Sequence, residues 1–203
     1  MNRRAMTYRT RAIATLFLPL ALLACDGPSA SAPQRPPLEG AKIGGPFTLV
    51  DKDGKSVRWQ DFDGEYRIVY FGYTFCPDAC PTDVNVMMQG FSHFEKEHPD
   101  LANEVRPIFI SIDPARDTPE AVGQFAAAFS PRLLGLTGTP EQVEQAAKAF
   151  AAYYAKGEES AGGYLMDHSR AAYLMGRDGK PIAILPVDAN PEAVSQELEK
   201  WVK

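Results

Sequence analysis

The sequence RIVYFGYTFCPDACPTDVNVMMQGFSHFEKE, residues 67–97, joins the pattern of a buried β-strand to that of a helix. Residues 67–73 are rich in β-branched and aromatic residues, which predicts a central strand of a sheet. The segment from Cys80 to about residue 97 has apolar residues at helical spacing, namely Val84, Met87, Met88, Phe91 and Phe94. Cys76 and Cys80 therefore fall where the strand gives way to its helix. Open α/β sheets place their chemistry at such carboxyl ends of strands.

The elements expected on both sides of this unit predict an α/β fold. Residues 105–112 form a second central strand, and the strand–helix–strand step predicts a right-handed parallel crossover. Thr118-Pro119 and Thr139-Pro140 each supply an N-cap residue followed by proline at the first helical position. The remaining predicted elements are hairpins at 47–59 and 171–185 with Asp-Gly turns, helices to about residues 129 and 150, a short strand at 133–136 and a terminal helix at 191–202. This order predicts a thioredoxin-like fold, with a central mixed sheet flanked by helices and an added N-terminal hairpin.

The composition of the 203-residue chain is that of a globular protein, with 45% hydrophobic and 23% charged residues. Its net charge of −5 gives no electrostatic reason to expect nucleic-acid binding. The length allows one domain of moderate size, which can bury a core without disulfide bonds. We expect that domain at residues 38–203.

The N-terminal residues have the pattern of an export signal. Residues 1–24 contain four arginines and no acidic residue, and their apolar run at 12–24 is shorter than the about 20 residues of a membrane-spanning helix. Cys25 ends this run in a sequence that resembles the lipobox of bacterial lipoproteins, where the thiol of the first mature residue is acylated. Residues 25–37, rich in proline and serine, then predict a tether. A cleaved signal without lipidation is the alternative.

Cys76 and Cys80 have the spacing and position of a reactive pair. A helix N-terminus presents free N–H groups and a partial positive charge, which lower the pKa of a thiol there. The four-residue separation places both sulfurs on one helical face, where they can form a disulfide or bind one metal ion. Thioredoxin-type oxidoreductases use a Cys-x-x-Cys spacing, so the additional residue suits a metal without forbidding a disulfide. A purely structural disulfide is the alternative, but the loop that it closes is too small for much entropic stabilisation.

A firm metal site needs a third ligand, and the chain has three histidines. His93 and His98 lie late in the predicted helix, where exposed polar residues need no special role. His168 lies directly before the strand predicted at 171–175, in a loop that neighbours the cysteines in the inferred fold, and could be a ligand or a structural histidine. Two thiolates and an imidazole suit copper in either oxidation state. Zinc would normally require a fourth ligand, and Met166 is more typical of core packing.

Four segments together resemble the Sco/SenC family of copper-binding assembly factors for cytochrome c oxidase. They are GPFTLV (45–50), YFGYTFCPDACP (70–81), SIDPARDT (111–118) and Asp167-His168. The resemblance implies a thioredoxin-like domain that binds one copper, as Cu(I) or Cu(II), through Cys76, Cys80 and His168. It also implies a domain that is tethered to the bacterial cell membrane and faces the periplasm. Such a domain would assist assembly of the binuclear copper site of oxidase subunit II and receive its copper from a periplasmic donor, and we expect it to be a monomer.

Acidic residues within two of these motifs define a predicted partner face. The resemblance makes Asp113 and Asp117 part of the face that contacts a partner or transfers copper, and Asp78, between the cysteines, could help to shape it. The alternative is that these residues only stabilise the local backbone. Asp113-Pro114 is a typical start of a turn, and the negative charge of Asp117, directly before the helix capped by Thr118, interacts favourably with the helix dipole.

Three functions stay open at this point. A copper chaperone binds and transfers its metal without turnover, so on this hypothesis the protein is not an enzyme. A thiol–disulfide oxidoreductase would use Cys76 and Cys80 as a redox pair on oxidase or other exported proteins, without a need for His168. The absence of a proline from residues 164–170 and the wider cysteine spacing disfavour it. A thiol peroxidase is the third, since residues 74–76 weakly resemble a peroxidatic site.

Overall fold

The computed structural model describes residues 34–159 and 163–203 of the chain. Residues 35–203 form one compact unit. The predicted signal segment, the predicted lipidation site Cys25 and most of the predicted tether lie outside the described residues. Within residues 34–159 and 163–203, no helix has both the length and the apolar character needed to cross a membrane.

A five-stranded mixed sheet forms the centre of the unit, with the strand order β5-β4-β3-β8-β9. The strands β3 (Tyr66–Gly72), β4 (Val105–Ser111) and β5 (Leu134–Leu136) run parallel to one another. β8 (Ala172–Met175) and β9 (Pro181–Leu185) complete the sheet in antiparallel pairings. Every residue of β3 is buried, as expected for a strand covered on both faces. The predicted central mixed sheet is therefore confirmed.

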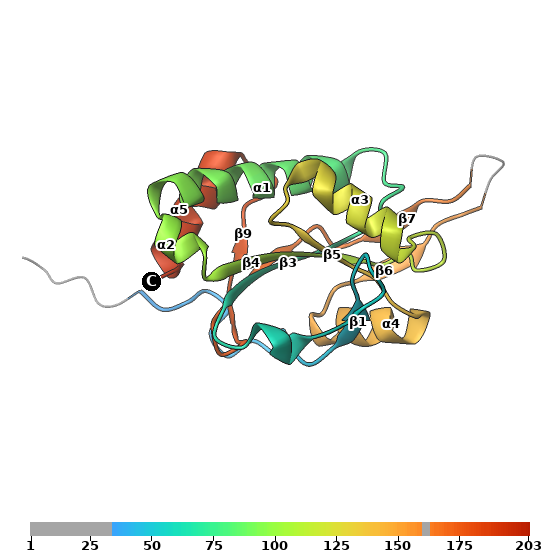
Figure 1. Cartoon of the computed structure of the whole chain (residues 1–203), viewed down its shortest axis with the longest axis horizontal. Helices are drawn as coiled ribbons and strands as arrows, with labels where there is room; N and C mark the ends of the chain where they lie inside the picture. Colours follow the sequence, from blue (N-terminus) through green and yellow to red (C-terminus); the bar gives the residue numbers. More distant parts are fainter. Residues whose placement is uncertain (1–33, 160–162) are drawn as a thin grey trace, which may run out of the picture. The chain divides into compact units, whose positions relative to one another are not determined.

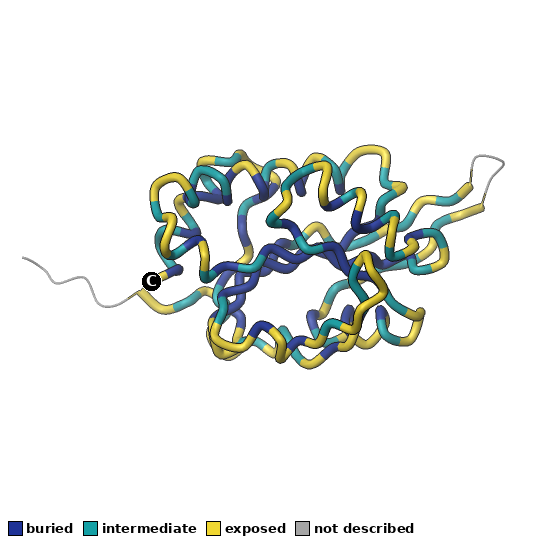
Figure 2. The backbone as a smooth tube through the Cα atoms, viewed as in Figure 1, coloured by how far each residue is buried: buried dark blue, intermediate teal, exposed yellow. Residues whose placement is uncertain are grey.

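Helices cover both faces of this sheet (Figure 1). One face carries α1 (Ala79–Glu97), α2 (Pro99–Ala102), α3 (Pro119–Phe129) and α5 (Pro191–Trp201). The other face carries α4 (Pro140–Ala149) together with the hairpin of β1 (Thr48–Val50) and β2 (Ser56–Arg58) and the short helix η1 (Trp59–Phe62). Figure 2 shows that the sheet between these layers is buried almost throughout.

Alternation along the strands divides the aromatic core between the two faces. Tyr70 stacks on Phe109 at 6.3 Å between ring centroids, and Phe109 packs at 4.7 Å against Phe125 of α3. The next residue of β3, Phe71, points the opposite way and lies 5.5 Å from Phe150 at the end of α4. Two hydrophobic layers thus fix the sheet rigidly, so the loop that follows β3 starts from a well-defined point.

The predicted helix starts are confirmed at both Thr-Pro sites. The Thr118 side chain accepts a hydrogen bond from the backbone N–H of Ala121 at 3.2 Å, and Thr139 accepts one from Gln142 at 3.3 Å. Proline follows each cap at the first helical position, where its missing N–H costs nothing.

One hairpin was not predicted. β6 (Tyr154–Lys156) pairs antiparallel with β7 (Met166–His168) in a separate two-stranded sheet, where a loop was expected. Each strand has only three residues, and the chain between them, rich in glycine and glutamate, offers no hydrophobic alternation to indicate strands. The difference matters because His168 is the last residue of β7.

Candidate metal centre

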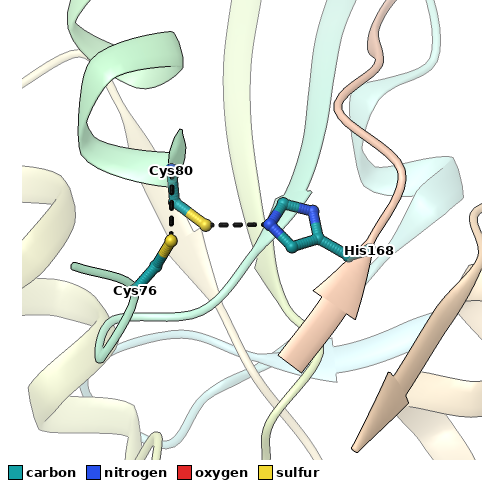
Figure 3. Close-up of side chains that lie close together, drawn as sticks. All are labelled: Cys76, Cys80 and His168. Carbon is teal, nitrogen blue, oxygen red and sulfur yellow. Dashed lines mark hydrogen bonds between the residues drawn. The ribbon is translucent and has the colours of Figure 1, made fainter. Parts of the chain in front are cut away.

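Three elements bring Cys76, Cys80 and His168 together at the carboxyl end of β3 (Figure 3). Cys76 lies in the loop after β3, Cys80 in the first turn of α1, and His168 at the end of β7. The Cys80 Sγ atom is 3.0 Å from His168 Nε2, and the Cys80 backbone N–H donates to Cys76 Sγ at 3.3 Å. One ligand atom from each residue lies within 4.8 Å of the other two, so the group could hold one metal ion.

The imidazole of His168 is oriented from both sides of its ring. Its Nδ1 lies 2.9 Å from the Ser169 carbonyl oxygen and donates to it, which leaves the lone pair of Nε2 facing the sulfurs. The rings of Tyr70 and Tyr73 meet the imidazole edge to face, at 6.3 and 6.0 Å between centroids. The tautomer that a metal requires is therefore the one that the surroundings select.

The two thiols have opposite pKa shifts. Burial raises the pKa of Cys80, which has no exposed surface, and the nearby Cys76 and Asp83 raise it further. Burial also acts to raise the pKa of Cys76. This effect of burial is outweighed by hydrogen bonds that the Cys76 sulfur accepts. The donors are the backbone N–H groups of Cys80 and Asp78 and the side chains of Cys80 and Tyr73, so the pKa of Cys76 lies below its ordinary value. Cys76 is thus the more readily ionised thiol of the pair, and Cys80 holds its proton more strongly.

Alkylation should distinguish the two thiols in the reduced, metal-free chain. We expect iodoacetamide at pH 7 to modify Cys76 at least about ten times faster than Cys80, because one pKa unit alone changes the thiolate fraction about tenfold. As pH rises, the Cys76 rate should increase first, since its pKa is lowered and that of Cys80 is raised. Peptide mapping by mass spectrometry measures both rates, with Cys25→Ser as the background. Equal rates would contradict this assignment.

The predicted partner residues fall in two different environments. Asp78 is exposed beside the cysteines, whereas Asp113 and Asp117 are only 3% and 1% exposed. The Asp117 carboxylate accepts hydrogen bonds from the Ser111 hydroxyl at 2.6 Å and from the N–H and hydroxyl of Thr74 at 3.0 and 2.6 Å. Asp117 therefore ties the loop after β4 to the loop that carries the cysteines. A role of these residues in partner contact stays a prediction.

The other two histidines lie at the far end of α1. The His98 residue caps α1 and packs its ring against Phe94 at 5.2 Å, while His93 lies 3.9 Å from the Glu192 carboxylate. Glu97, His98 and Glu199 could together approach one cation. Their oxygen-rich, partly exposed donor set lacks a thiolate, so it does not match the soft character of the cysteine site.

A buried charged group beneath the metal centre was not predicted from the sequence. Asp83, with no exposed surface, accepts hydrogen bonds from the Tyr70 hydroxyl at 2.9 Å and from the guanidinium of Arg170 at 2.8 and 2.5 Å. One feature of the sequence could have indicated this buried group. Asp83 comes three residues after Cys80 and next to Val84, on the apolar face of the predicted helix, where a carboxylate requires a polar partner.

Comparisons with known proteins identify relatives of this chain. The SCO1/SenC family model matches residues 35–203. Protein SenC of Rhodobacter capsulatus is 39% identical over 158 residues, which cover 78% of this chain and 70% of SenC. The chain spans about half the length of the mitochondrial SCO1 homologues that it matches.

Solved structures of similar proteins share the fold. Arabidopsis thaliana ScoI, solved with copper bound, is 35% identical with a TM-score of 0.73, over 78% of this chain and 96% of that one. BsSco, described as a Sco-family cytochrome c oxidase assembly protein with a disulfide switch, is 25% identical with a TM-score of 0.63, over 84% and 100%. These similarities confirm the predicted thioredoxin-like fold.

Proposed function

The chain belongs to the SCO1/SenC family, and from that premise we propose that it is a copper chaperone for assembly of the binuclear copper site of cytochrome c oxidase. It binds one copper ion through Cys76, Cys80 and His168 and passes it to oxidase subunit II. The observation that carries the proposal is the convergence of two sulfurs and the imidazole Nε2 within 4.8 Å.

The donor set fits copper in both oxidation states. Two thiolates are soft ligands that suit Cu(I), and an imidazole nitrogen extends the preference to Cu(II). His168 Nε2 is free to bind because Nδ1 is committed to the Ser169 carbonyl. Cys76 loses its proton more readily than Cys80, and a metal ion would displace the proton of Cys80 on binding.

Access to the site supports transfer rather than storage. Cys80 is buried, but Cys76 and His168 are only partly buried, so an incoming ligand can approach from the side of these two residues. Phe75, directly before Cys76, is 56% exposed, which is unusual for a side chain of this size. It suits contact with a partner protein at the point where copper changes ligands, and the exposed Asp78 adds a negative charge to the same rim. We propose that subunit II and a periplasmic copper donor use this rim in turn, and that the chain acts as a monomer.

Tethering to the membrane is the second part of the proposal. The basic and apolar segment 1–24, the lipobox-like position of Cys25 and the proline-rich residues 25–37 support a lipid anchor with a spacer. Such an anchor places the domain on the periplasmic side of a bacterial cell membrane, where subunit II presents its copper site. The bacterial relative SenC is consistent with this placement.

A thiol–disulfide oxidoreductase is the alternative, and the lowered pKa of Cys76 favours it. A thiolate at a helix N-terminus can attack a disulfide of the acceptor, and Cys80 then resolves the mixed disulfide. In this reaction the two thiols of the chain become a disulfide while the acceptor disulfide is reduced to two thiols. The chemistry needs no contribution from His168.

A transfer experiment separates the two functions. The full chain in detergent is loaded with one equivalent of copper and mixed with the copper-free domain of oxidase subunit II, whose cysteines are either reduced or oxidised. We expect copper to move to the reduced acceptor from the wild type, and His168→Ala to deliver less than about a tenth as much, since it loses a ligand. Copper delivery that is independent of His168, together with reduction of the oxidised acceptor by the copper-free chain, would overturn the chaperone proposal in favour of the oxidoreductase.

A further inference from the structure

His168 is held by an element that lies outside the central sheet. Its strand β7 pairs with β6 in a two-stranded sheet, whereas the cysteines follow β3 and open α1. The central sheet resumes only at Ala172 of β8, which pairs with Tyr70 of β3 four residues after His168. Its hydrogen-bond ladder therefore anchors the chain near His168 but does not by itself fix the imidazole against Cys80, and side-chain contacts of the hairpin add to that constraint.

An ion pair provides such a contact two residues after His168. The Arg170 guanidinium donates from Nε to Asp83 Oδ2 at 2.8 Å and from Nη2 to Asp83 Oδ1 at 2.5 Å. Asp83 lies in α1, about one helical turn after Cys80, and its side chain is fully buried. The pair thus links the segment that carries the imidazole to the helix that carries the buried sulfur.

A second set of contacts lies four residues before His168. The Tyr164 hydroxyl donates to Asp113 Oδ1 at 2.8 Å, and the Tyr164 carbonyl accepts from Arg116 Nη1 at 2.9 Å. The Arg116 guanidinium also lies 3.7 Å from the centroid of the Tyr164 ring. The hairpin is therefore attached on both sides of the imidazole, and Asp83–Arg170 is the attachment that reaches the cysteine helix.

The geometry of the ion pair is directional. Two parallel N–H···O contacts fix both the distance and the plane of a guanidinium relative to a carboxylate. Burial of the Asp83 carboxylate carries a desolvation cost, which hydrogen bonds from Arg170 and from the Tyr70 hydroxyl offset. A pair that only stabilised the fold could be replaced by packed apolar side chains. Because it joins the helix of Cys80 to the segment that follows His168, this pair can also orient the imidazole.

We propose that Asp83, acting through Arg170, is a positioning residue that holds His168 against Cys80 before copper arrives. This inference rests on the proposed function, in which His168 is a copper ligand. A site arranged in advance binds its metal without first ordering the hairpin, and loss of an outer contact typically lowers metal affinity by about 10–100-fold. The effect should be larger for Cu(II), which uses the imidazole, than for Cu(I), which the two thiolates can hold.

The test measures the position of His168 without metal and then with it. In the reduced, metal-free full chain, the NMR shifts of the His168 ring protons report its edge-to-face contacts with Tyr70 and Tyr73. Cu(II) titration then gives the affinity, and electron paramagnetic resonance gives the nitrogen coupling. We expect Arg170→Met to move the ring shifts towards those of an exposed histidine, to weaken Cu(II) binding about 10–100-fold, and to reduce the nitrogen coupling. Arg170→Lys should restore part of each change.

Two further variants keep the test decisive. The double variant Asp83→Asn, Arg170→Met removes both charges, so it avoids an unpaired buried carboxylate and should still lose the His168 contacts. Arg106→Met is the matched control, because Arg106 makes a similar two-nitrogen contact with Glu65, at 3.2 and 3.4 Å, at the amino ends of β4 and β3, away from the cysteines at the carboxyl end of β3. It should leave the spectra and the copper affinity unchanged.

The outcomes distinguish this inference from the proposed function. Wild-type ring shifts and Cu(II) affinity in both Arg170→Met and the double variant would overturn the positioning role while leaving the chaperone proposal intact. The ligand role of His168 would instead be contradicted if the copper spectrum of the wild-type protein showed no nitrogen coupling and was identical to that of His168→Ala. The metal-free NMR shifts would then still decide whether Asp83 and Arg170 hold the imidazole in place.

Discussion

Replacement of Cys80 with serine should abolish stoichiometric copper binding by the reduced chain. Cys80 supplies the buried sulfur of the group, and a hydroxyl is a poor ligand for a soft metal ion. Four-ligand structural zinc sites bind with about 10–16 kcal/mol, or about 2.5–4 kcal/mol per ligand. Because about 1.4 kcal/mol corresponds to a factor of ten, the loss of one ligand should lower the affinity by two to three orders of magnitude.

Serine is nearly the size of cysteine, so the variant tests the ligand and leaves the packing almost unchanged. Copper content after dialysis and competition with a Cu(I) chelator measure the effect, and circular dichroism checks that the fold is kept. Cys25→Ser is the matched control, because it removes the one cysteine that is not part of the site and should bind copper like the wild type. An affinity of Cys80→Ser within about tenfold of the wild type would exclude Cys80 as a ligand.

The sequence was sufficient to predict the central sheet and its helices because their signals are local and mutually consistent. The β3 strand is a continuous apolar run, and α3 and α4 each open with a threonine cap and a proline. The placement of the cysteines at the junction of β3 and α1 follows from these elements alone. Both cysteines could therefore be located in the fold without reference to any contact between distant residues.

The position of His168 could not be derived in the same way. Its hairpin has strands of three residues, and one of its attachments joins Arg170 to Asp83, a residue 87 positions earlier in the chain. Local patterns do not encode a contact of that separation. The residues alone left His168 as either a ligand or a structural histidine, and the resemblance to a known family was needed to decide between them.

Gly90 shows the same limit within a well-predicted helix. A glycine inside a helix is unfavourable by itself, and the sequence gives no reason for it. In the structure, a β-carbon at Gly90 would lie 2.5 Å from the Val194 side chain and 2.6 Å from the Pro191 carbonyl oxygen. The close approach of α1 and α5 explains the residue, and only the packed structure reveals that approach.

Asp117→Ala should destabilise the metal-free chain by about 3 kcal/mol, because a buried donor that loses its acceptor costs about 1–3 kcal/mol. Three donors, the Ser111 hydroxyl and the N–H and hydroxyl of Thr74, would lose that acceptor together. Thr74 lies two residues before Cys76, so the cysteine loop should also loosen. Urea unfolding of the reduced chain measures the change in stability, and the alkylation rate of Cys80, which is buried in the wild type, reports the loosening.

Two comparisons separate this internal role from a contact with a partner. Thr118→Ala removes only the cap of the neighbouring helix and should cost about 1 kcal/mol, while Asp117→Asn keeps one acceptor oxygen and should recover part of the loss. If Asp117 instead acts mainly on a partner, Asp117→Ala would unfold within about 0.5 kcal/mol of the wild type, as surface substitutions usually do, and would bind the subunit II domain more weakly. The burial of its carboxylate, at 1% exposure, favours the internal role, because an acid that already accepts three hydrogen bonds inside the molecule has little left to offer a protein outside it.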